Sequence, residues 1–496
     1  MTGAPDPVWL GVDIGTQGCR GVAMDSSGRH LAAAEVPLAG RRRDGRHEQD
    51  PRDWVAATFG VLRAVRDQLA DGGGGPGGPD VGGLAICATS GTMLVADDRL
   101  HPLTVGIMYD DARAAAQAGR LAEVWAECAQ RNGYRIQPTW ALAKLAWCCE
   151  SQPSTRAGRL FHVADFVGSH LAGVPLPTDS SHALKSGYDL VRDGWPAEEF
   201  ERAGIPAIML PPVVRPGTVV GRIGDDAADS TGIPAGTPIV AGMTDGCASQ
   251  IAAGTVHPGQ WNSALGTTLV LKGVSAELVS DPDGAVYSHR HPDGGWFPGG
   301  ASSSGSAALA AAFPGVPPAE LDRWAEPLMP TDLIAYPLAS RGERFPFVRP
   351  DAEPFRSAEP GSAAELAAAL LQGVAFVERL CLSHLADLGA DTSGALSFTG
   401  GATSSALWNQ LRADVLGREI LLPRHPEAAA GMAIIAAAHG ESIAAAATAM
   451  VSGYRTVQPR AEHAARWQEI YLSMIDQLER RGYIRASLAS TARAAR

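Results

Sequence analysis

The chain has 496 residues, of which 45% are apolar and 19% charged, so we expect a folded protein with two domains rather than a disordered or fibrous one. Its formal net charge of −12 argues against nucleic acid and anionic membranes as partners, because both attract clusters of positive charge. A small-molecule ligand is the better expectation.

The cysteines and the start of the chain indicate a cytoplasmic protein. Seven cysteines, an odd number scattered mostly among apolar neighbours, fit reduced core thiols better than disulfides. Met1–Asp6 lacks the charged and apolar regions of a signal peptide, and apolar runs such as Ala428–Ala438 are too short to span a bilayer. Only three of the 41 basic residues are lysines, a bias that we interpret as compositional: Lys144, Lys185 and Lys272.

Apolar segments that end in polar turns recur along the chain. Val8–Asp13 and Cys19–Met24 predict two buried strands joined by a tight turn. Further strands are expected at 81–88, 236–242, 259–268 and 395–399, and helices at 52–70, 362–386, 428–439 and 461–481. The pattern of strand and glycine-rich turn begins again after Gly254, so we place a domain boundary there.

Three turns rich in glycine and threonine follow apolar strands, at 13–18, 265–268 and 398–402. Glycine lets a backbone approach phosphate oxygens closely, and exposed amides and threonine hydroxyls donate hydrogen bonds. Each turn alone fits an ordinary hairpin or helix start, but their recurrence in both halves favours phosphate binding. The chain has no Gly-Lys dipeptide and so lacks a P-loop, and its Gly-x-Gly-x-x-Gly at 72–77 precedes a strand and is assigned to a linker.

Two aspartates are candidates for chemistry. Asp13 and Asp245 both follow apolar strands and lie beside glycine, where a carboxylate can face a cleft. Phosphoryl transfer needs a metal that neutralises the phosphates and a carboxylate that orients and deprotonates the attacking hydroxyl. Separated aspartates can supply both, although each alone fits an Asx-turn or a helix cap about as well.

Two further clusters carry polar side chains. Tyr109–Arg113 places two acids and an arginine after an apolar segment, where they can hydrogen-bond a polyol; alternatively, Asp111 caps the helix that starts there. His289 and His291 are a candidate metal pair, but nothing nearby in the sequence completes a ligand set. We therefore interpret them as surface or capping histidines.

Together these motifs resemble the FGGY carbohydrate kinases, nearly from end to end. Asp13–Arg20 looks like the family's first phosphate motif, Gly242–Ala248 like the segment of its catalytic base, and Trp261–Thr268 like its second phosphate motif. Gly299–Ser304 resembles a nucleotide-contacting turn, and Thr399–Asp414 resembles the adenosine motif. The resemblance implies an α/β fold of two ribonuclease-H-like domains, of the actin and Hsp70 type, with ATP in the cleft between them.

The resemblance also implies how the domains divide the work. The N-terminal domain, 1–254, carries the sugar site, the first phosphate motif and the catalytic base. The C-terminal domain, 255–485, binds the nucleotide, and a flexible tail follows at 486–496. The implied ligands are ATP, Mg²⁺ and a small sugar, without nucleic acid or membrane, and a homodimer is left open.

Individual residues acquire roles by the same resemblance. Asp245 is the catalytic base, and Asp13 helps to hold Mg²⁺ and lies near the sugar. Thr89, Ser90 and Asp111 are expected at the sugar. The residues expected at ATP are Gly15, Thr16, Gln17, Gly266, Thr267, Thr268, Gly300, Gly400, Gly401 and Ser405.

The sugar is the most specific expectation. Xylulose kinases of the family usually have Gln-Met-His-Gly in place of Ala88–Gly91 and Trp-Asn-Asp in place of Tyr109–Asp111. Ala88–Met93 and Ala183–Asp189 look instead like the D-ribulose kinases of cyanobacteria and plants, in which a serine at the position of Ser90 contacts the ketopentose. We expect phosphorylation of D-ribulose at its terminal hydroxyl, with D-xylulose or another ketose or polyol as the alternative.

Two alternatives of another class use the same fold, a sugar or nucleotide sensor without catalysis and an actin- or Hsp70-like ATPase that acts on proteins. The complete set of Asp13, Thr16, Asp245 and a Gly-Thr-Thr turn argues against the sensor. No peptide-binding domain can be identified in the sequence, which argues against the chaperone.

Overall fold

The computed structural model describes residues 6–72 and 78–495. The predictions for the first five residues and for most of the linker at 72–77 therefore lie outside the described residues. The chain forms two compact units. Unit 1 comprises the chain up to Gly254 with His289–Gly295 and His425–Ser452; unit 2 comprises Thr255–Ser288, Trp296–Arg424 and the chain from Gly453. Two late segments thus return to the first unit, which a single boundary at Gly254 does not capture.

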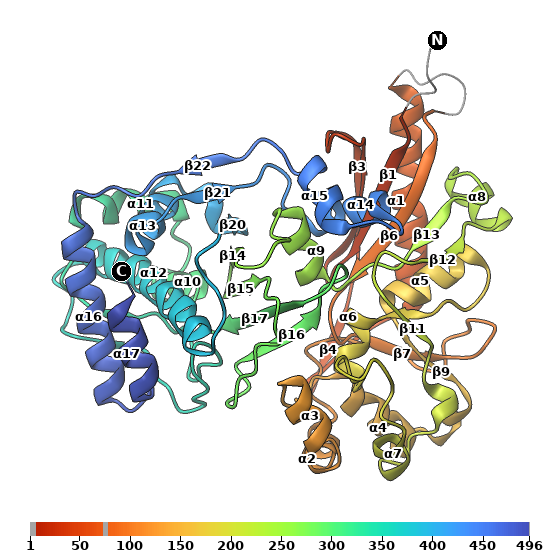
Figure 1. Cartoon of the computed structure of the whole chain (residues 1–496), viewed down its shortest axis with the longest axis horizontal. Helices are drawn as coiled ribbons and strands as arrows, with labels where there is room; N and C mark the ends of the chain where they lie inside the picture. The colour runs from red at the N-terminus through yellow and green to blue at the C-terminus, as the bar shows by residue number, and fades with distance from the viewer. Residues whose placement is uncertain (1–5, 73–77, 496) are drawn as a thin grey trace. The chain divides into compact units, whose positions relative to one another are not determined.

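Unit 1 is built on a six-stranded sheet of order β12-β13-β6-β1-β2-β3 (Figure 1). β1 pairs antiparallel with β2 and parallel with β6, and β13 pairs parallel with β6. The strands are β1 (Val8–Ile14), β2 (Gly18–Met24), β3 (His30–Pro37), β6 (Val81–Ala88), β12 (Val219–Arg222) and β13 (Pro238–Val240). Because β1, β6 and β13 run in the same direction, their carboxyl ends meet at one edge, where sites form in parallel sheets.

Helices cover both faces of this sheet. α1 packs against β2 and β3, and α14 packs against β1 and β6. A Cβ atom on Gly21 would lie 2.4 Å from Val61 of α1, whereas one on Gly11 would lie 1.8 Å from the backbone oxygen of Ala429 in α14. Only glycine allows α14 to approach β1 so closely. The helices are α1 (Pro51–Asp71), α5 (Val163–Ala172), α8 (Asp225–Thr231), α9 (Asp245–Ala252), α14 (Ala428–Ala438) and α15 (Ile443–Met450).

A second sheet of unit 1 has five strands in the order β4-β5-β8-β7-β9. Its strands are β4 (Arg41–Arg43), β5 (Arg46–Gln49), β7 (Met93–Ala96), β8 (Gly106–Ile107) and β9 (Arg159–His162). The smaller elements around it are α2 (Ala115–Val124), α3 (Ala126–Asn132), α4 (Ala141–Ser151), α6 (Ser180–Ala183), α7 (Ala197–Arg202), β10 (Thr178–Asp179) and β11 (Val213–Val214). This region carries the segments that were predicted to bind the sugar.

Unit 2 repeats the strand pairing of unit 1. Its seven-stranded sheet has the order β16-β17-β15-β14-β20-β21-β22, and β14 pairs antiparallel with β15 and parallel with β20, as β1 does with β2 and β6. The strands are β14 (Trp261–Leu265), β15 (Leu269–Gly273), β16 (Val286–Arg290), β17 (Trp296–Ser302), β20 (Leu396–Thr399), β21 (Ile420–Leu422) and β22 (Arg455–Val457). A small pair, β18 (Ala335–Tyr336) and β19 (Phe355–Arg356), lies outside it. The predicted α/β fold with two related domains is confirmed.

The core of unit 2 is organised around α12 (Ala363–Asp387). By length and composition α12 alone among the described helices could cross a membrane, yet 94% of its apolar stretch is buried inside the protein, as in a core helix. The sequence analysis predicted this helix at 362–386, within a residue of its observed bounds. The other helices are α10 (Ser306–Ala312), α11 (Pro318–Ala325), α13 (Ala406–Leu416), α16 (Ala464–Arg480) and α17 (Ala486–Ala494).

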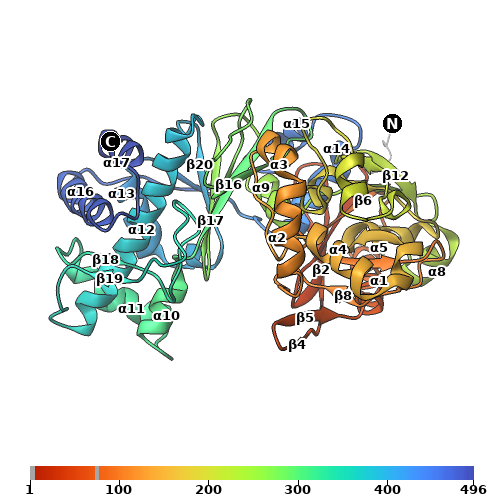
Figure 2. The ribbon, with the colours of Figure 1, turned by 90° about the horizontal axis from the view of Figure 1, so that it is seen from below.

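The end of the chain differs from the prediction of a flexible tail. α17 packs against α12 and α16, and it lies beside α16 in both views (Figure 1, Figure 2). Its residues Leu488, Ala489 and Ala492 are buried on one face. This short amphipathic pattern completes the core of unit 2. The other predicted strands and helices are present with bounds that differ by a few residues, and all seven cysteines are buried free thiols, as predicted.

Candidate active site

Asp13 and Asp245 lie on the same side of the unit 1 sheet. Asp13 follows Gly11 by two residues in β1, and side chains two apart in a strand share a face, so its carboxylate points to the side that α14 covers. α9, which begins at Asp245, packs against α14 and β6. The two carboxylates are close enough for their charges to interact.

The surroundings of Asp13 oppose ionisation. Burial raises the pKa of this carboxyl group from 3.8 to about 6, and the charge of Asp245 contributes to the rise. The Cys87 thiol, with Sγ 3.5 Å from Oδ1 of Asp13, and the Arg20 guanidinium act in the opposite direction. Raised pKa values of this kind cluster at functional sites. Two carboxylates with an uncompensated charge offer the oxygen ligands that Mg²⁺ prefers, so the residues present fit this ion.

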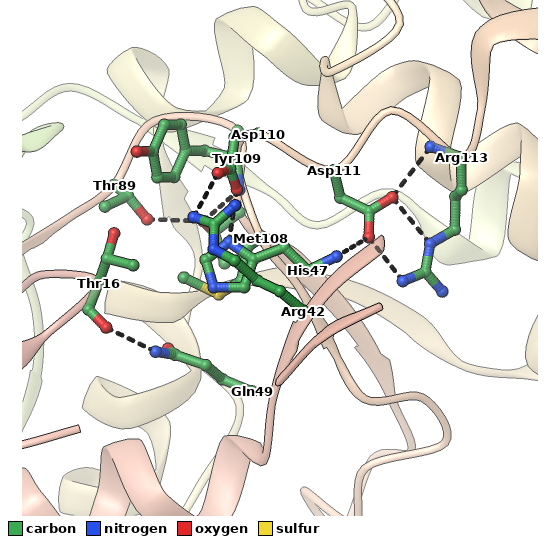
Figure 3. Close-up of polar contacts among 12 residues, drawn as sticks. Thr16, Arg42, His47, Gln49, Thr89, Met108, Tyr109, Asp110, Asp111 and Arg113 are labelled. Atoms are coloured by element: carbon green, nitrogen blue, oxygen red, sulfur yellow. Dashed lines mark hydrogen bonds and ion pairs between the residues drawn. The ribbon is translucent and has the colours of Figure 1, made fainter. Parts of the chain in front are cut away.

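The first glycine-rich turn joins β1 to β2. Gly15 N donates a hydrogen bond to Gly18 O at 2.9 Å, which closes the turn. Gln49 Nε2 donates to the carbonyl oxygen of Thr16 at 2.8 Å and fixes the turn from outside (Figure 3). Gly15 and Thr16 are half-buried and Gln17 is exposed, so a phosphate can approach their backbone.

Thr89 and Ser90 follow β6 at the same sheet edge. Thr89 Oγ1 is hydrogen-bonded to Thr92 Oγ1 at 2.6 Å, so its hydroxyl is engaged within the loop. Ser90 Oγ is buried and has no hydrogen-bond partner within residues 6–72 and 78–495. A buried hydroxyl in this state calls for an explanation, and a hydroxyl group of a ligand would satisfy it.

Two of the three lysines hold the loop that carries Ser90. Lys144 Nζ donates to Gly91 O at 3.1 Å and to Met108 O at 2.6 Å, and burial lowers the pKa of this amine to about 7. Lys185 Nζ donates to Ser90 O at 3.4 Å. Sequence reasoning overlooked both residues because it treated the scarcity of lysine as compositional. In a chain with only three lysines, each lysine that is present is a candidate for a specific role, and this was the signal in the sequence that could have pointed to Lys144 and Lys185.

Asp111 is part of a buried ion-pair network. It is 0% exposed and accepts hydrogen bonds from His47 N at 2.6 Å, from Arg113 N at 3.0 Å and from the Arg113 guanidinium at 2.6 and 2.9 Å (Figure 3). Burial opposes ionisation, but the hydrogen bonds from Arg113 and His47 outweigh it and lower the pKa of Asp111. The neighbouring Asp110 accepts from Arg42 at 2.7 Å and contacts His47 Nδ1 at 2.6 Å. The alternative interpretation of Asp111 as a helix cap is not met, because α2 starts only at Ala115 and its N-cap is Ala114.

The second glycine-rich turn lies between β14 and β15 of unit 2. Gly266 N donates to Thr268 O at 3.0 Å, and Ser306 N, at the start of α10, donates to Gly266 O at 3.0 Å. A Cβ atom added to Gly266 would meet nothing within 4 Å. Thr267 is exposed at the tip. The turn therefore combines a fixed backbone with open space beside it.

The third turn follows β20. Gly400 has a φ of 84°, and a Cβ atom there would lie 2.5 Å from Leu265 O, so glycine is required and the ends of β20 and β14 touch. Gly401 is exposed and faces open space. Ser405 Oγ accepts from Trp408 N at 2.9 Å as the N-cap of α13. The second and third turns thus form one edge of the unit 2 sheet.

Two expectations need correction. Gly300 does not lie in a turn: it lies within β17, pairs with Leu271, and a Cβ atom on it would meet the Phe345 ring at 2.7 Å. Its small size serves close packing. His289 and His291 are buried rather than on the surface, and Nδ1 of His291 accepts from Asp293 N at 2.9 Å, which is a capping contact.

Comparison with known proteins covers most of the chain. Residues 8–252 match the N-terminal domain of the FGGY family of carbohydrate kinases, and residues 262–440 match its C-terminal domain. Between them the two matches include all three glycine-rich turns, Asp13 and Asp245.

Individual relatives agree with the family match. The chain is 27% identical to a xylulose kinase of Streptomyces rubiginosus, over 97% of this chain and 95% of that protein. It is 26% identical to an autoinducer-2 kinase of Yersinia enterocolitica, over 94% of this chain and 95% of that protein. The crystal structure of xylulose kinase from Rhodospirillum rubrum superimposes with a TM-score of 0.85 at 26% identity, covering 95% of this chain and 99% of that one.

Proposed function

The chain belongs to the FGGY family of carbohydrate kinases and is an ATP- and Mg²⁺-dependent sugar kinase; we propose that its acceptor is the terminal hydroxyl of a ketopentose, D-ribulose, and that Asp245 is the base. The observation that carries the assignment of the base is the meeting of Asp245 and Asp13 at one sheet edge, with the phosphate-type turn of Thr16 beside Asp13.

Asp245 suits the role of a base. It is the first residue of α9, where the partial positive charge of the helix start favours a carboxylate, and Gly246 N donates to its Oδ1 at 2.7 Å. The side chain is half-buried and so is accessible to a ligand. In this proposal it orients the sugar hydroxyl and accepts its proton as the phosphoryl group is transferred from ATP to that oxygen.

Asp13 would hold Mg²⁺, directly or through water. The bound ion supplies positive charge that neutralises the phosphates. Asp13 can do this at neutral pH, because a pKa of about 6 leaves its carboxylate ionised at pH 7 and above. The amides around Thr16 in unit 1, and those of Gly266 and Gly401 in unit 2, are the proposed phosphate and nucleotide contacts.

The choice of sugar rests on the loop after β6. Ser90 offers a buried hydroxyl that lacks a partner among the described residues, at the position where ribulose kinases of the family use serine. Because Asp111 is enclosed by Arg113 and His47, we propose that it shapes the sugar site through Tyr109 and Asp110 rather than by direct contact. D-Xylulose is the second candidate, since two relatives named above are xylulose kinases.

The test is ADP release with D-ribulose, D-xylulose, L-ribulose, glycerol and autoinducer-2, with kcat/KM compared across them and the product identified by NMR. We expect D-ribulose to have the highest kcat/KM and to yield the 5-phosphate. A higher value for D-xylulose would overturn the choice of sugar and leave the kinase assignment intact. ATP turnover without any sugar would favour the protein-directed ATPase.

The base is tested separately. Asp245→Asn is expected to lower kcat by at least about 1,000-fold, because it removes both the proton acceptor and the orienting charge. ATP affinity should change little. The matched control is Asp97→Asn, a partly exposed aspartate in a turn of the same unit, which should keep full activity. Turnover of Asp245→Asn within tenfold of the wild type would refute the assignment.

Three further proposals concern the localisation and partners of the protein, the roles of its two units and its oligomeric state. We propose that the protein works in the cytoplasm with small molecules alone, which the buried free thiols support. Unit 1 would carry the sugar and the base, and unit 2 would carry the nucleotide. A homodimer is an expectation that sedimentation velocity tests directly.

A further inference from the structure

One segment of unit 1 contacts both the loop that carries Ser90 and the residue that precedes Asp245. We call it the strap, Thr178–Gly187; it begins in β10 and continues through α6. His162, which is fully buried, holds both of its ends: Nδ1 lies 2.8 Å from Thr178 Oγ1, and Nε2 lies 2.8 Å from Ser186 Oγ. Asp179 fixes the middle by accepting hydrogen bonds from Ser181 N at 2.8 Å and His182 N at 3.0 Å. The strap is therefore a rigid part of the protein.

The middle of the strap is bonded to the residue before Asp245. Thr244 N donates to Ser181 Oγ at 2.9 Å, and Ser181 Oγ donates to Thr244 Oγ1 at 3.1 Å. Ser181 and Thr244 are 0% and 1% exposed, so water does not compete for either bond. This pair of hydrogen bonds fixes both the backbone and the side chain of Thr244.

Thr244 gives up a common stabilising contact to make this pair. It is the N-cap of α9, a position where threonine usually accepts a hydrogen bond from an amide of the first helical turn. Its hydroxyl makes no such bond within the described part of α9 and is turned to Ser181 instead. The start of α9, and with it the direction of Asp245, is thus set by the strap.

The other contact of the strap reaches the sugar loop. Lys185, four residues after Ser181, donates from Nζ to Ser90 O at 3.4 Å, and its Cδ lies 3.3 Å from where a Cβ atom on Gly91 would be. Gly91 has a φ of 94°, so the loop turns sharply beneath the lysine stem. One short segment therefore contacts the loop of Ser90 and the helix start of Asp245.

We propose that Ser181 is a positioning residue for sugar phosphorylation: through Thr244 it aims Asp245, and through Lys185 the same strap sets the Ser90 loop relative to that base. The inference rests on the proposed function, in which Asp245 is the base and Ser90 contacts the sugar. Misplacement of a reacting group by about 1 Å can cost on the order of 100-fold in rate, so a loss of aim should appear in kcat.

The test compares Ser181→Ala with Ser169→Ala. Ser169 is an equally buried serine of unit 1 that also donates one hydrogen bond, to Asp165 O at 2.6 Å, and accepts one, from Leu176 N at 2.9 Å. Both variants should lose a similar amount of thermal stability. We expect Ser181→Ala to lower kcat by about 10- to 100-fold with sugar and ATP KM values within about twofold, and Ser169→Ala to keep kcat within twofold. Equal effects on kcat in the two variants would overturn the proposal.

A second pair keeps the test decisive if Ser181→Ala does not fold. Thr244→Ser retains the hydroxyl that Ser181 contacts, whereas Thr244→Val removes it at nearly constant volume. We expect near-normal kcat for the serine variant and a loss of about tenfold or more for the valine variant. Equal kcat values in these two proteins would overturn the positioning role.

The link through the strap is tested with Lys185→Met. This variant should raise the sugar KM. In the double variant with Ser181→Ala, the loss of kcat/KM should be smaller than the product of the two single losses, because either substitution alone already loosens the strap that both contacts hold. Fully multiplicative effects would mean that the two ends act independently and would refute the link. Failure of the proposed function is a separate outcome, since it appears as turnover in Asp245→Asn whatever Ser181→Ala does.

Discussion

Replacing Asp13 with asparagine is expected to make the folded protein more stable while it abolishes activity. A pKa raised from 3.8 to about 6 corresponds to about 3 kcal/mol of destabilisation by the ionised carboxylate, at about 1.4 kcal/mol for each pH unit. Asparagine has nearly the same shape and carries no charge. Because Asp13 is half-buried and water screens part of the interaction, we expect a gain of about 2 kcal/mol at pH 8.

The sign of this effect depends on pH. Below about pH 3.8 the carboxyl group is protonated in both the folded and the unfolded chain, so the substitution should change stability little. Between about pH 4 and 6 the unfolded chain loses the proton first, and the cost of the carboxylate grows. Above about pH 6 the full difference in the free energy of unfolding is present and stays constant.

The assay is urea unfolding followed by tryptophan fluorescence in EDTA at several pH values from 4 to 8. Asp97→Asn is the control with the opposite trend, since the backbone amide of His101 lowers the pKa of Asp97 and its charge is therefore favourable in the folded state. A gain for Asp13→Asn that is the same at pH 4 and pH 8, or a loss of stability at pH 8, would refute the reasoning. Adding Mg²⁺ and ATP should stabilise the wild type more than Asp13→Asn.

Three further changes test the packing and the site. Lys144→Met removes the amine that bonds Gly91 O and Met108 O and should raise the sugar KM by about tenfold with a smaller effect on ATP KM; steady-state kinetics with unchanged sugar KM would contradict it. Gly11→Ala should destabilise unit 1 by about 3 kcal/mol or more, because α14 has to move to make room for the new methyl group. A melting temperature within about 2 °C of the wild type would contradict this prediction. Arg412→Met leaves the buried Glu378 carboxylate, 2.7 Å away in the wild type, without its partner and should cost about 3–5 kcal/mol in urea unfolding, whereas adding Glu378→Leu should recover much of the loss.

The sequence was sufficient to predict the parts of the site that lie at strand ends. Asp13 follows a continuous apolar run, and the glycine-rich turn after it is local, so the hairpin of β1 and β2 could be predicted from spacing alone. The same holds for the turn at Gly266. These turns lie near the ends of other strands because β1 and β14 pair in parallel with β6 and β20. The family resemblance implies this parallel pairing, whereas an apolar run in the sequence does not show which strands pair.

The missed features depend on contacts between distant parts of the chain. Asp111 stays a predicted sugar-site residue, but nothing near it in the sequence indicates that its carboxylate accepts a hydrogen bond from His47 N, 64 positions earlier. Lys144 reaches backbone carbonyls 36 and 53 positions away. No periodicity or local motif records such partners, because the residue types involved are also common on the surface.

The return of His425–Ser452 to unit 1 has a consequence for how the protein is made. α14 covers β1 and β6, yet about 340 residues separate the end of β6 at Ala88 from the start of α14 at Ala428, so α14 is synthesised long after β6. Until then the apolar face under Gly11 has no native cover. During translation the sheet of unit 1 therefore lacks one of its covering helices, and we expect chaperones to bind its exposed apolar face. For the same reason, a fragment that ends at Gly254 should aggregate rather than fold. The two units are therefore distinct in the folded protein, but unit 1 cannot complete its folding before most of unit 2 has been synthesised.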